Sequence, residues 1–320
     1  MCKHLRLISL FATALALGAC KGSDSDSEIF LDNPATAGST SEPKLETDTA
    51  KLDAALKCTP FAHPDKPPVL LVHGTFTNGP EQYNWTYLPL LIERGFDVCL
   101  VSYPDRGLGD QQISAEYVVH ALRRIHAESG RKVAMIGHSQ GAAMPRWALK
   151  WWPSARAAVE DFVLQAGPNH GSNVASRPPL IPELLGLPAA LYQVAPDSDF
   201  VAAVNRDDET PGEVSYTSLY TQFDELVQPV APVPTAALDW GLDNPKVSNV
   251  LLQDLCPGRF VDHVTIGLTD RLAFELTLDA ISHPGPANIE RAGGVALCGL
   301  LPLLPDQIFA ATFLTDLLGV

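Results

Sequence analysis

Short runs of consecutive apolar residues recur along the chain and predict the strands of a buried sheet. The first run, Pro68–Gly74, consists of valines and leucines and closes on a histidine and a glycine. A run that is apolar at every position is typical of a parallel strand covered on both faces. Comparable runs predict further strands at Phe96–Ser102, Lys132–Ile136, Asp161–Gln165, Ser215–Thr221 and Val247–Leu252.

Two segments between these runs have the spacing of helices. In Ile113–Ser129 apolar side chains recur every three or four residues, and Gly130 ends the segment. A second helix is predicted over Ala142–Trp152, where Pro153 stops it. Strands that alternate with helices predict an α/β fold with a mostly parallel central sheet and helices on both faces.

The segment between Ser172 and Asp207 is rich in proline and leucine and has no clear period. We expect it to form a small cap or pocket wall rather than part of the sheet. No second linker or repeat follows, so residues 51–320 are predicted to form one catalytic domain.

The first fifty residues differ from the rest. A basic stretch precedes the apolar run Leu7–Leu17, which is too short to span a bilayer and predicts an export signal. The run ends in Leu-Gly-Ala-Cys, which resembles a bacterial lipobox. Residues 1–20 are therefore predicted to be a signal peptide of the lipoprotein type, with lipidation of Cys20 and residence in the cell envelope. A plain secretory signal is the alternative. Residues 21–50 are polar and acidic and predict a flexible tether.

Composition narrows the classes of partner. Hydrophobic residues make up 46% of the 320 positions, which excludes a wholly disordered chain. The formal net charge of −15 argues against nucleic acid and against electrostatic binding to anionic lipid headgroups. Membrane attachment is therefore expected through lipidated Cys20, and nothing in the sequence implies a protein partner.

Four cysteines remain once the signal is set aside: Cys58, Cys99, Cys256 and Cys298. In an exported chain they can pair in three ways, and no two of them have the close spacing of a zinc or redox site. Structural disulfides are the better interpretation. The sequence contains no metal-binding or nucleotide-binding motif, so no metal and no cofactor is expected.

The pentapeptide Gly137-His138-Ser139-Gln140-Gly141 carries the clearest chemistry. It follows a predicted buried strand and precedes a predicted helix, which is the context of a nucleophile elbow. The sharp turn leaves no room for side chains beside Ser139, and the helix directs its first amides towards an anion formed there. Ser139 is thus the expected nucleophile.

A serine hydroxyl becomes a strong nucleophile only when a base takes its proton and an acid orients that base. In hydrolases with this elbow the order is serine, acid, histidine, so both partners should follow Ser139. The histidines beyond it are His170, His263 and His283. His170 lies too close to the elbow, and His283 lies in a Pro-Gly turn. His263, shortly after the Val247–Leu252 run, is the expected base.

Asp224 directly follows the Ser215–Thr221 run and is the expected acid. Its nearest rival is Glu225, whereas Asp262 is too close to His263 in sequence. The oxyanion needs at least two preorganised donors. One is expected to be the amide of Gln140, after the nucleophile. The other is expected from Thr75, in the loop after the first run.

At this point the residues resemble a known family, the lipases of the Candida antarctica lipase B type. The resemblance runs from about Leu52 to the C-terminus. It rests on Val69–Trp85, on Ser139–Gly141 with the following Trp147 and Pro153, on Ser218–Tyr220 with Asp224–Pro229, and on Cys256 with Val261–His263.

The resemblance implies an α/β-hydrolase fold, serine lipase or esterase activity and the triad Ser139–Asp224–His263. It also implies an oxyanion hole from Thr75 and Gln140. The disulfide pairing that it implies is Cys58–Cys99 and Cys256–Cys298.

Three features depart from the family. The tryptophan that floors the alcohol side of the family's pocket is replaced by His138, which predicts a roomier, more polar pocket that discriminates enantiomers less. Phe76 replaces a glycine and is expected to narrow the pocket opening. The last apolar segment, Ile308–Leu318, lacks the family's final cysteine pair. The expected substrate-pocket residues are Phe76, Thr77, His138, Leu226 and Val227.

These observations together predict a serine carboxylic ester hydrolase that cleaves fatty-acyl esters. Three alternatives use the same triad: a polyesterase, a phospholipid or small-ester esterase, and an acyltransferase. A catalytically silent surface lipoprotein on a hydrolase scaffold is the alternative from another class.

Overall fold

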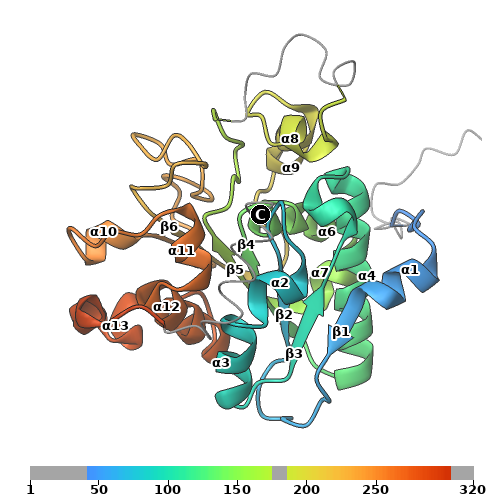
Figure 1. Ribbon diagram of the computed structural model, residues 1–320, viewed down its shortest axis with the longest axis horizontal. Helices are drawn as coiled ribbons and strands as arrows, with labels where there is room; N and C mark the ends of the chain where they lie inside the picture. The colour runs from blue at the N-terminus through green and yellow to red at the C-terminus, as the bar shows by residue number, and fades with distance from the viewer. Residues whose placement is uncertain (1–41, 175–185, 304–320) are drawn as a thin grey trace, which may run out of the picture. The chain divides into compact units, whose positions relative to one another are not determined.

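A seven-stranded sheet forms the centre of the computed structural model, which describes residues 42–174 and 186–303. The strand order is β1-β3-β2-β4-β5-β6-β7, and all neighbours are parallel except β1 and β3 (Figure 1). The strands are β1 (Leu56–Cys58), β2 (Val69–Val72), β3 (Val98–Val101), β4 (Val133–His138), β5 (Val159–Gln165), β6 (Ser215–Tyr220) and β7 (Val247–Leu251). The mostly parallel sheet confirms the fold class predicted from the apolar runs.

The apolar runs correspond to β2 through β7, whereas β1 was not predicted from the sequence. That strand is three residues long, and Lys57 and Cys58 are exposed. A short, half-exposed edge strand has no continuous apolar run, so its pattern does not differ from that of a loop.

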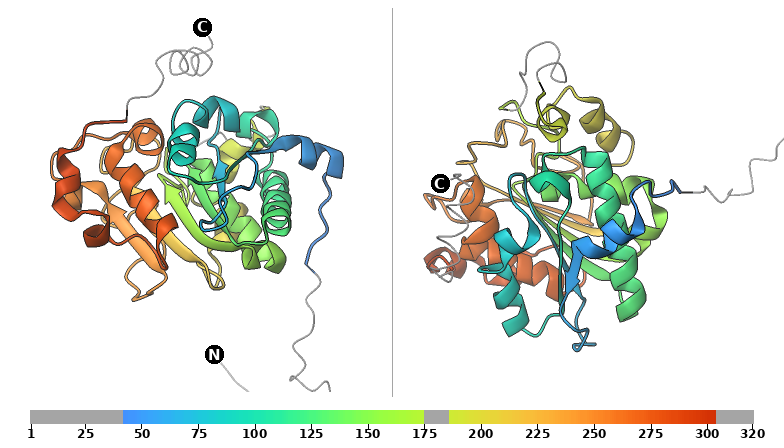
Figure 2. Two further views of the ribbon diagram at one scale, coloured as in Figure 1. Left: turned by 90° about the horizontal axis from the view of Figure 1, so that it is seen from below. Right: turned by 45° about the vertical axis from the view of Figure 1, so that its right-hand side comes forward.

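Helices cover both faces of the sheet, as the turned views show (Figure 2). Alternate residues of each strand point to opposite faces. On β2, Leu70 and Val72 belong to one apolar cluster with the helices α1, α4, α6 and α7, whereas Val69 and Leu71 belong to another with α3 and α12. These helices are α1 (Thr49–Ala55), α3 (Tyr87–Glu93), α4 (Gln111–Ser129), α6 (Pro145–Trp151), α7 (Pro153–Ala157) and α12 (Arg271–Ser282).

The remaining helices are short. They are α2 (Gly79–Tyr83), η1 (Pro104–Gly107), α5 (Gln140–Ala143), α8 (Ala189–Gln193), α9 (Asp199–Asn205), α10 (Leu252–Leu255), α11 (His263–Leu268), α13 (Ile289–Ala292) and η3 (Gly294–Gly299). None of the helices in the described residues combines the length and apolarity needed to cross a bilayer.

The helix predicted over Ala142–Trp152 is interrupted. The structure has α5 up to Ala143 and a separate α6 that begins at Pro145. Proline lacks an N–H and clashes with the preceding turn, so it is tolerated at the first position of a helix but not in the interior.

The proline- and leucine-rich segment contributes α8 and α9, which lie outside the sheet as expected for a cap. The buried guanidinium of Arg146, on α6, joins this region to the domain. Its terminal nitrogens donate to the Asn169 carbonyl at 2.8 Å and to the Asn205 side chain at 2.7 Å. The predicted segment Ile308–Leu318 lies outside the described residues.

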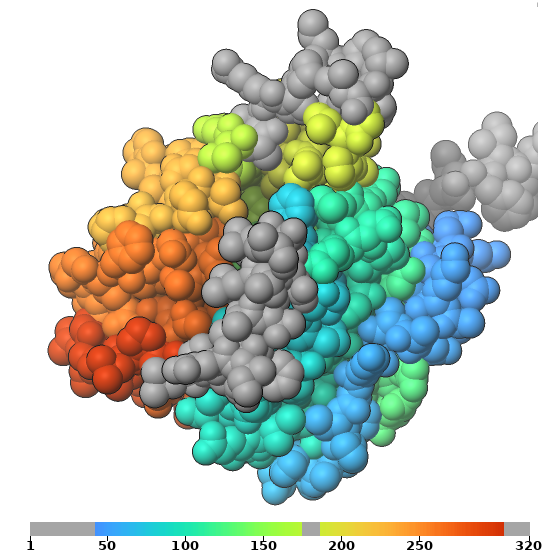
Figure 3. Space-filling model, viewed as in Figure 1, coloured from blue at the N-terminus to red at the C-terminus, as the bar shows by residue number. Residues whose placement is uncertain are grey.

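The structure corrects the domain boundary predicted at residue 51. Residues 42–50 are not a free tether, because their backbone and side chains bind α4 and its neighbours. The Glu116 carboxylate accepts the amides of Glu46 and Thr47 at 3.0 and 2.7 Å, and Trp152 donates to the carbonyl of Pro43. Figure 3 shows this segment, in blue, beside α4. Polar composition predicted flexibility here, but specific hydrogen bonds order the chain.

Two disulfides are present, with the pairing that the family resemblance implies. Cys58–Cys99 joins the neighbouring strands β1 and β3, and Cys256–Cys298 joins α10 to η3. The joined cysteines are 41 and 42 residues apart in sequence. In the chain-entropy model each bond stabilises the fold by about 4 kcal/mol. Disulfides are typical of proteins exported to an oxidising compartment.

Replacing Glu116 by alanine tests how firmly residues 42–50 are bound. We expect the free energy of unfolding to fall by about 1–3 kcal/mol, because two backbone N–H groups lose a buried charged acceptor. The measurement is urea denaturation. Glu128→Ala on the same helix removes only an exposed pair with Arg124 and should cost no more than about 0.5 kcal/mol. Equal losses in both variants would contradict the assignment.

Candidate active site

Ser139 lies on a strained turn between β4 and α5. Its backbone has φ 56° and ψ −124°, a left-handed region that residues other than glycine rarely adopt. The turn is held on both sides, because the Ser139 amide donates to the Gln165 carbonyl and the Ser139 carbonyl accepts from Ala142. This geometry lifts the side chain out of the sheet at the carboxyl end of β4.

Glycine is required at positions 137 and 141, on either side of Ser139, because no side chain fits there. A Cβ atom on Gly137 would collide with the carbonyl of Gly141, and one on Gly141 would collide with the carbonyls of Val72 and His73. Strand β2 and the start of α5 therefore approach each other more closely than side chains permit.

A continuous line of hydrogen bonds joins the three expected catalytic residues. Ser139 Oγ lies 2.9 Å from His263 Nε2, and His263 Nδ1 lies 3.0 Å from each carboxylate oxygen of Asp224. A carboxylate only accepts, so Nδ1 carries the proton and Nε2 is free to accept from the serine hydroxyl. The arrangement is that of a nucleophile, its base and an orienting acid.

Asp224 is only 3% exposed, and its charge is compensated locally. Besides the imidazole, its Oδ1 accepts the amides of Leu226 and Val227 at 2.9 and 2.7 Å. These bonds close a tight turn after β6 and orient the carboxylate towards His263. Hydrogen bonds from such partners offset the cost of burying a carboxylate.

His263 is the first residue of α11, and the residues around it fix its backbone. Asp262 caps the helix and forms a capping box with Thr265. The side chain of Glu225 accepts the backbone amide of His263 at 3.1 Å. Asp262 and Glu225, the rival acids, thus contact the backbone beside the base rather than its ring.

The other candidate bases lie in different surroundings. His170 binds Glu209 at 2.8 Å, and half-exposed His283 binds the carbonyl of Asp279 at 3.0 Å. No hydrogen bond joins either ring to Ser139 in the described part of the chain.

Thr75 and Gln140, the expected oxyanion donors, both line the cavity beside Ser139. Gln140 is the first residue of α5, so no carbonyl within that helix accepts its N–H. The loop that carries Thr75 approaches the elbow closely, since a Cβ atom on Gly74 would lie 3.2 Å from the Ser139 Cβ. This proximity suits a second donor from the loop after β2.

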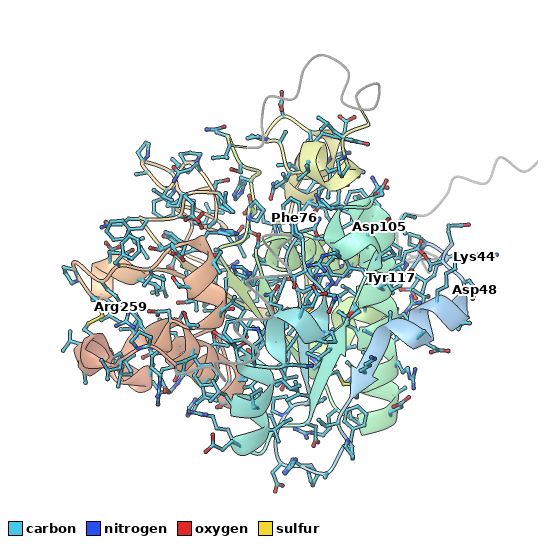
Figure 4. The ribbon with its side chains drawn as sticks, in the orientation of Figure 1. Lys44, Asp48, Phe76, Asp105, Tyr117 and Arg259 are labelled. Carbon is cyan, nitrogen blue, oxygen red and sulfur yellow. A yellow bond between two sulfur atoms is a disulfide. The ribbon has the colours of Figure 1, made fainter. Side chains whose placement is uncertain are left out.

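Phe76 occupies the position beside the oxyanion loop with φ 68°, a conformation that favours glycine. Its amide donates to the Arg106 carbonyl at 2.7 Å, and the Arg106 guanidinium donates back to the Phe76 carbonyl at 2.8 Å. These two bonds hold the strained backbone. The side chain, labelled in Figure 4, is 48% exposed and lines the same cavity as Ala190 and Leu191 of α8.

The cavity that opens on Ser139 has a volume of about 340 Å³ and is mostly apolar. All five predicted pocket residues line it. The sequence analysis missed several others, which are Gln82, Gln111, Pro168, Ser172, Val174, Ala190, Leu191, Val194, Val264 and Leu268. An available signal was the apolar spacing of Val264 and Leu268 after the base, which places both on one face of α11. Gln82 carries no such signal.

Two buried histidines near the elbow are kept neutral. Burial lowers the pKa of His73 to about 3, and burial together with the nearby charge of His263 lowers that of His138 to about 3. His73 stacks on Tyr103 with ring centroids 3.8 Å apart. His138 lines the cavity, as expected. The weaker discrimination between enantiomers that it is expected to cause stays a prediction.

No group of three or more potential metal ligands occurs in residues 42–174 and 186–303. The chemistry described above requires only the side chains and amides already named.

Comparisons with known proteins agree with this geometry. A family model described as the alpha/beta hydrolase family matches residues 69–305. Lipase B of Pseudozyma antarctica is 31% identical over 281 residues, which is 86% of this chain and 80% of that protein. A triacylglycerol lipase of Pseudomonas fragi is 32% identical over 153 residues, covering 45% of this chain and 50% of that one.

The fold is also similar to a solved structure. Aspergillus fumigatus lipase B matches with a TM-score of 0.72 at 29% identity, over 87% of this chain. The match covers 66% of that protein, so the present chain spans about two thirds of its length.

The neutral histidines predict a pH dependence of stability. Below about pH 6.5 the unfolded chain protonates His73 and His138, whereas the folded chain keeps both neutral down to about pH 3. Each histidine should therefore make the free energy of unfolding decrease as pH falls, with a slope approaching 1.4 kcal/mol per pH unit. Buried Asp161 acts in the opposite direction, because burial raises its pKa to about 8 and the folded chain then binds the proton that the unfolded chain releases.

Urea denaturation at several pH values between 5 and 7.5 measures this slope, and His138→Gln should reduce it by one histidine's share. Thr277→Val changes a buried residue that does not titrate. It should lower the free energy of unfolding but keep the wild-type dependence of that free energy on pH. A His138→Gln slope equal to the wild-type slope would be inconsistent with a neutral buried histidine, because the contribution of Asp161 is the same in both proteins.

Proposed function

The chain belongs to the α/β-hydrolase family and is a homologue of lipase B, and we propose that it cleaves fatty-acyl esters through an acyl-enzyme on Ser139. Its named relatives are lipases, and the chain is an enzyme of the lipase and esterase class. The observation that carries the proposal is the line of hydrogen bonds from Ser139 through His263 to Asp224, at the base of an apolar cavity.

In the first half of the reaction Ser139 Oγ bonds to the ester carbonyl carbon, and His263 Nε2 takes the hydroxyl proton. Asp224 stabilises the resulting imidazolium through the Nδ1 hydrogen bond. The negative charge that develops on the carbonyl oxygen is bound by the donors of Thr75 and Gln140. When the intermediate collapses, the bond to the alcohol oxygen breaks and His263 returns the proton to that oxygen.

In the second half a water molecule attacks the acyl-enzyme, with His263 again as the base. Collapse of this intermediate releases the fatty acid and restores the Ser139 hydroxyl. An alcohol in place of water would complete an acyl transfer by the same steps.

The lining of the cavity supports a neutral, apolar substrate. Leu191, Val194, Leu226 and Val227 lie on its walls, and none of the described lining residues is a lysine, arginine, aspartate or glutamate. An apolar acyl chain gains free energy from burial in such a cavity. A charged headgroup would find no complementary charge there. These features favour fatty-acyl esters over anionic lipids.

We also propose that Cys20 is lipidated and anchors the protein to the bacterial cell envelope. The support is the Leu-Gly-Ala-Cys sequence after an apolar run, together with the two disulfides that indicate export. The net charge of −15 makes electrostatic attachment to anionic lipids unfavourable, so the acyl chains would hold the protein.

Replacement of Ser139 by alanine tests the nucleophile. Turnover of a p-nitrophenyl acyl ester should fall at least about 10⁴-fold, because no acyl-enzyme can form. A fluorophosphonate probe should label the wild type and not the variant. Ser154→Ala, an exposed serine on α7, is the matched control and should retain activity. Labelling or full turnover by Ser139→Ala would disprove the assignment.

Mass spectrometry of the mature protein from a bacterial host tests the anchor. The expected N-terminal peptide begins at Cys20 and carries the added mass of acyl chains. A Cys20→Ala variant should lose that mass and leave the membrane fraction. A mature wild-type chain that begins elsewhere, or a free Cys20 thiol, would rule the anchor out.

A further inference from the structure

A chain of buried side-chain hydrogen bonds connects three loops of the site and is separate from the triad itself. The Gly74 amide, in the oxyanion loop, lies 2.8 Å from Gln82 Oε1. Gln82 Nε2 lies 3.3 Å from His138 Nδ1, and His138 Nε2 lies 2.7 Å from the carbonyl oxygen of His263. Gln82 is on α2, and His138 ends β4 immediately before the nucleophile.

The two ends of this chain determine its direction. The carbonyl of His263 only accepts, so His138 Nε2 carries a proton. Because the pKa of His138 is lowered to about 3, the ring is neutral at ordinary pH, and its Nδ1 is an acceptor. The amide of Gln82 therefore donates to Nδ1 through Nε2, and its Oε1 accepts from Gly74. Each of the three hydrogen bonds then joins one donor to one acceptor, and a flipped Gln82 amide would break two of them.

Close packing keeps the His138 ring in this position. The ring lies against Gly267 of α11 so tightly that a Cβ atom there would collide with it. His138 and Gln82 are both buried, at 6% and 1% exposed. Neither side chain can turn to another partner without disturbing α11 or the oxyanion loop.

We propose that Gln82 and His138 are positioning residues that hold the oxyanion loop and the base at a fixed separation around Ser139. The inference rests on the proposed function. His263 is then held at three points: its ring by Asp224, its amide by Glu225 and its carbonyl by His138. His138 also binds Gln82, and Gln82 in turn holds the oxyanion loop that presents Thr75.

The neutral state of His138 also suits the reaction. Its ring centroid lies 5.1 Å from that of His263, which becomes an imidazolium during catalysis. A second cation at that distance would oppose the first, whereas a neutral donor does not. His138 therefore provides a hydrogen bond beside the base without adding charge.

His138→Phe tests the proposal, since it keeps an aromatic ring and removes both hydrogen bonds. We expect kcat for a p-nitrophenyl acyl ester to fall about 10–100-fold, because small displacements of reacting groups cost rate in this range. KM should change less than kcat, since the apolar walls formed by Leu191, Val194 and Leu226 are unaltered. A trifluoromethyl ketone, which forms a tetrahedral adduct on Ser139, should lose affinity in parallel with kcat/KM.

Two other substitutions of His138 each keep one of its two hydrogen bonds and show which bond supports kcat. His138→Gln places an amide where it can still donate to the His263 carbonyl, and His138→Asn places an oxygen where it can still accept from Gln82. Each should restore part of the kcat lost by His138→Phe. Gln82→Met breaks the chain at its other end and should lower kcat in the same way. The double variant with His138→Phe should lose less than the product of the two single losses, because both break one chain.

Folding of each variant is checked by urea denaturation, and Gln82→Met carries the test if His138→Phe does not fold. Wild-type kcat in folded His138→Phe and Gln82→Met would overturn the proposal, as would a loss confined to KM. Failure of the proposed function would look different, since wild-type protein itself would then lack turnover and fluorophosphonate labelling.

Discussion

The left-handed turn at Ser139 is the constraint on which the arrangement of the site depends. A strand that enters this turn at Gly137 must continue into a helix at Gln140, and the close approach of β2 leaves no space for side chains at the flanking glycines. The strain is supported by the sheet, because the Ser139 amide binds a carbonyl of β5. The hydroxyl, the helix amides and the oxyanion loop are consequently brought within a few ångströms of one another.

Electrostatics in the site follow from burial. Two amides and an imidazole donate to the buried carboxylate of Asp224. His73 and His138 have no carboxylate hydrogen-bond partner among the described residues, and burial lowers the pKa of each to about 3, so both remain neutral. The acid and the base of the triad are thereby placed in an apolar environment, where each hydrogen bond to a developing charge is stronger than in water.

Features outside the site hold its loops in place. The disulfide Cys256–Cys298 joins the end of α10 to η3, close in sequence to the loop that carries His263. Arg146 ties α6, which follows the nucleophile helix, to the loop at Asn169 and to α9 of the cap. The segment 42–50 binds α4 through the Glu116 carboxylate. The chain before His263 and the loop at Asn169 are thus fixed to neighbouring elements.

Local pattern in the sequence determined the strands β2 to β7, the long helix α4 and the nucleophile turn, because each has a continuous apolar run, a helical period or paired glycines. The order of serine, acid and histidine singled out Asp224 and His263. The short edge strand β1, the break at Pro145 and the ordering of residues 42–50 were decided by contacts with distant residues. So was the chain from Gly74 through Gln82 and His138 to His263, whose members are up to 189 positions apart. Hydrogen bonds between such distant groups have no periodic signature, and only the packed tertiary structure creates them.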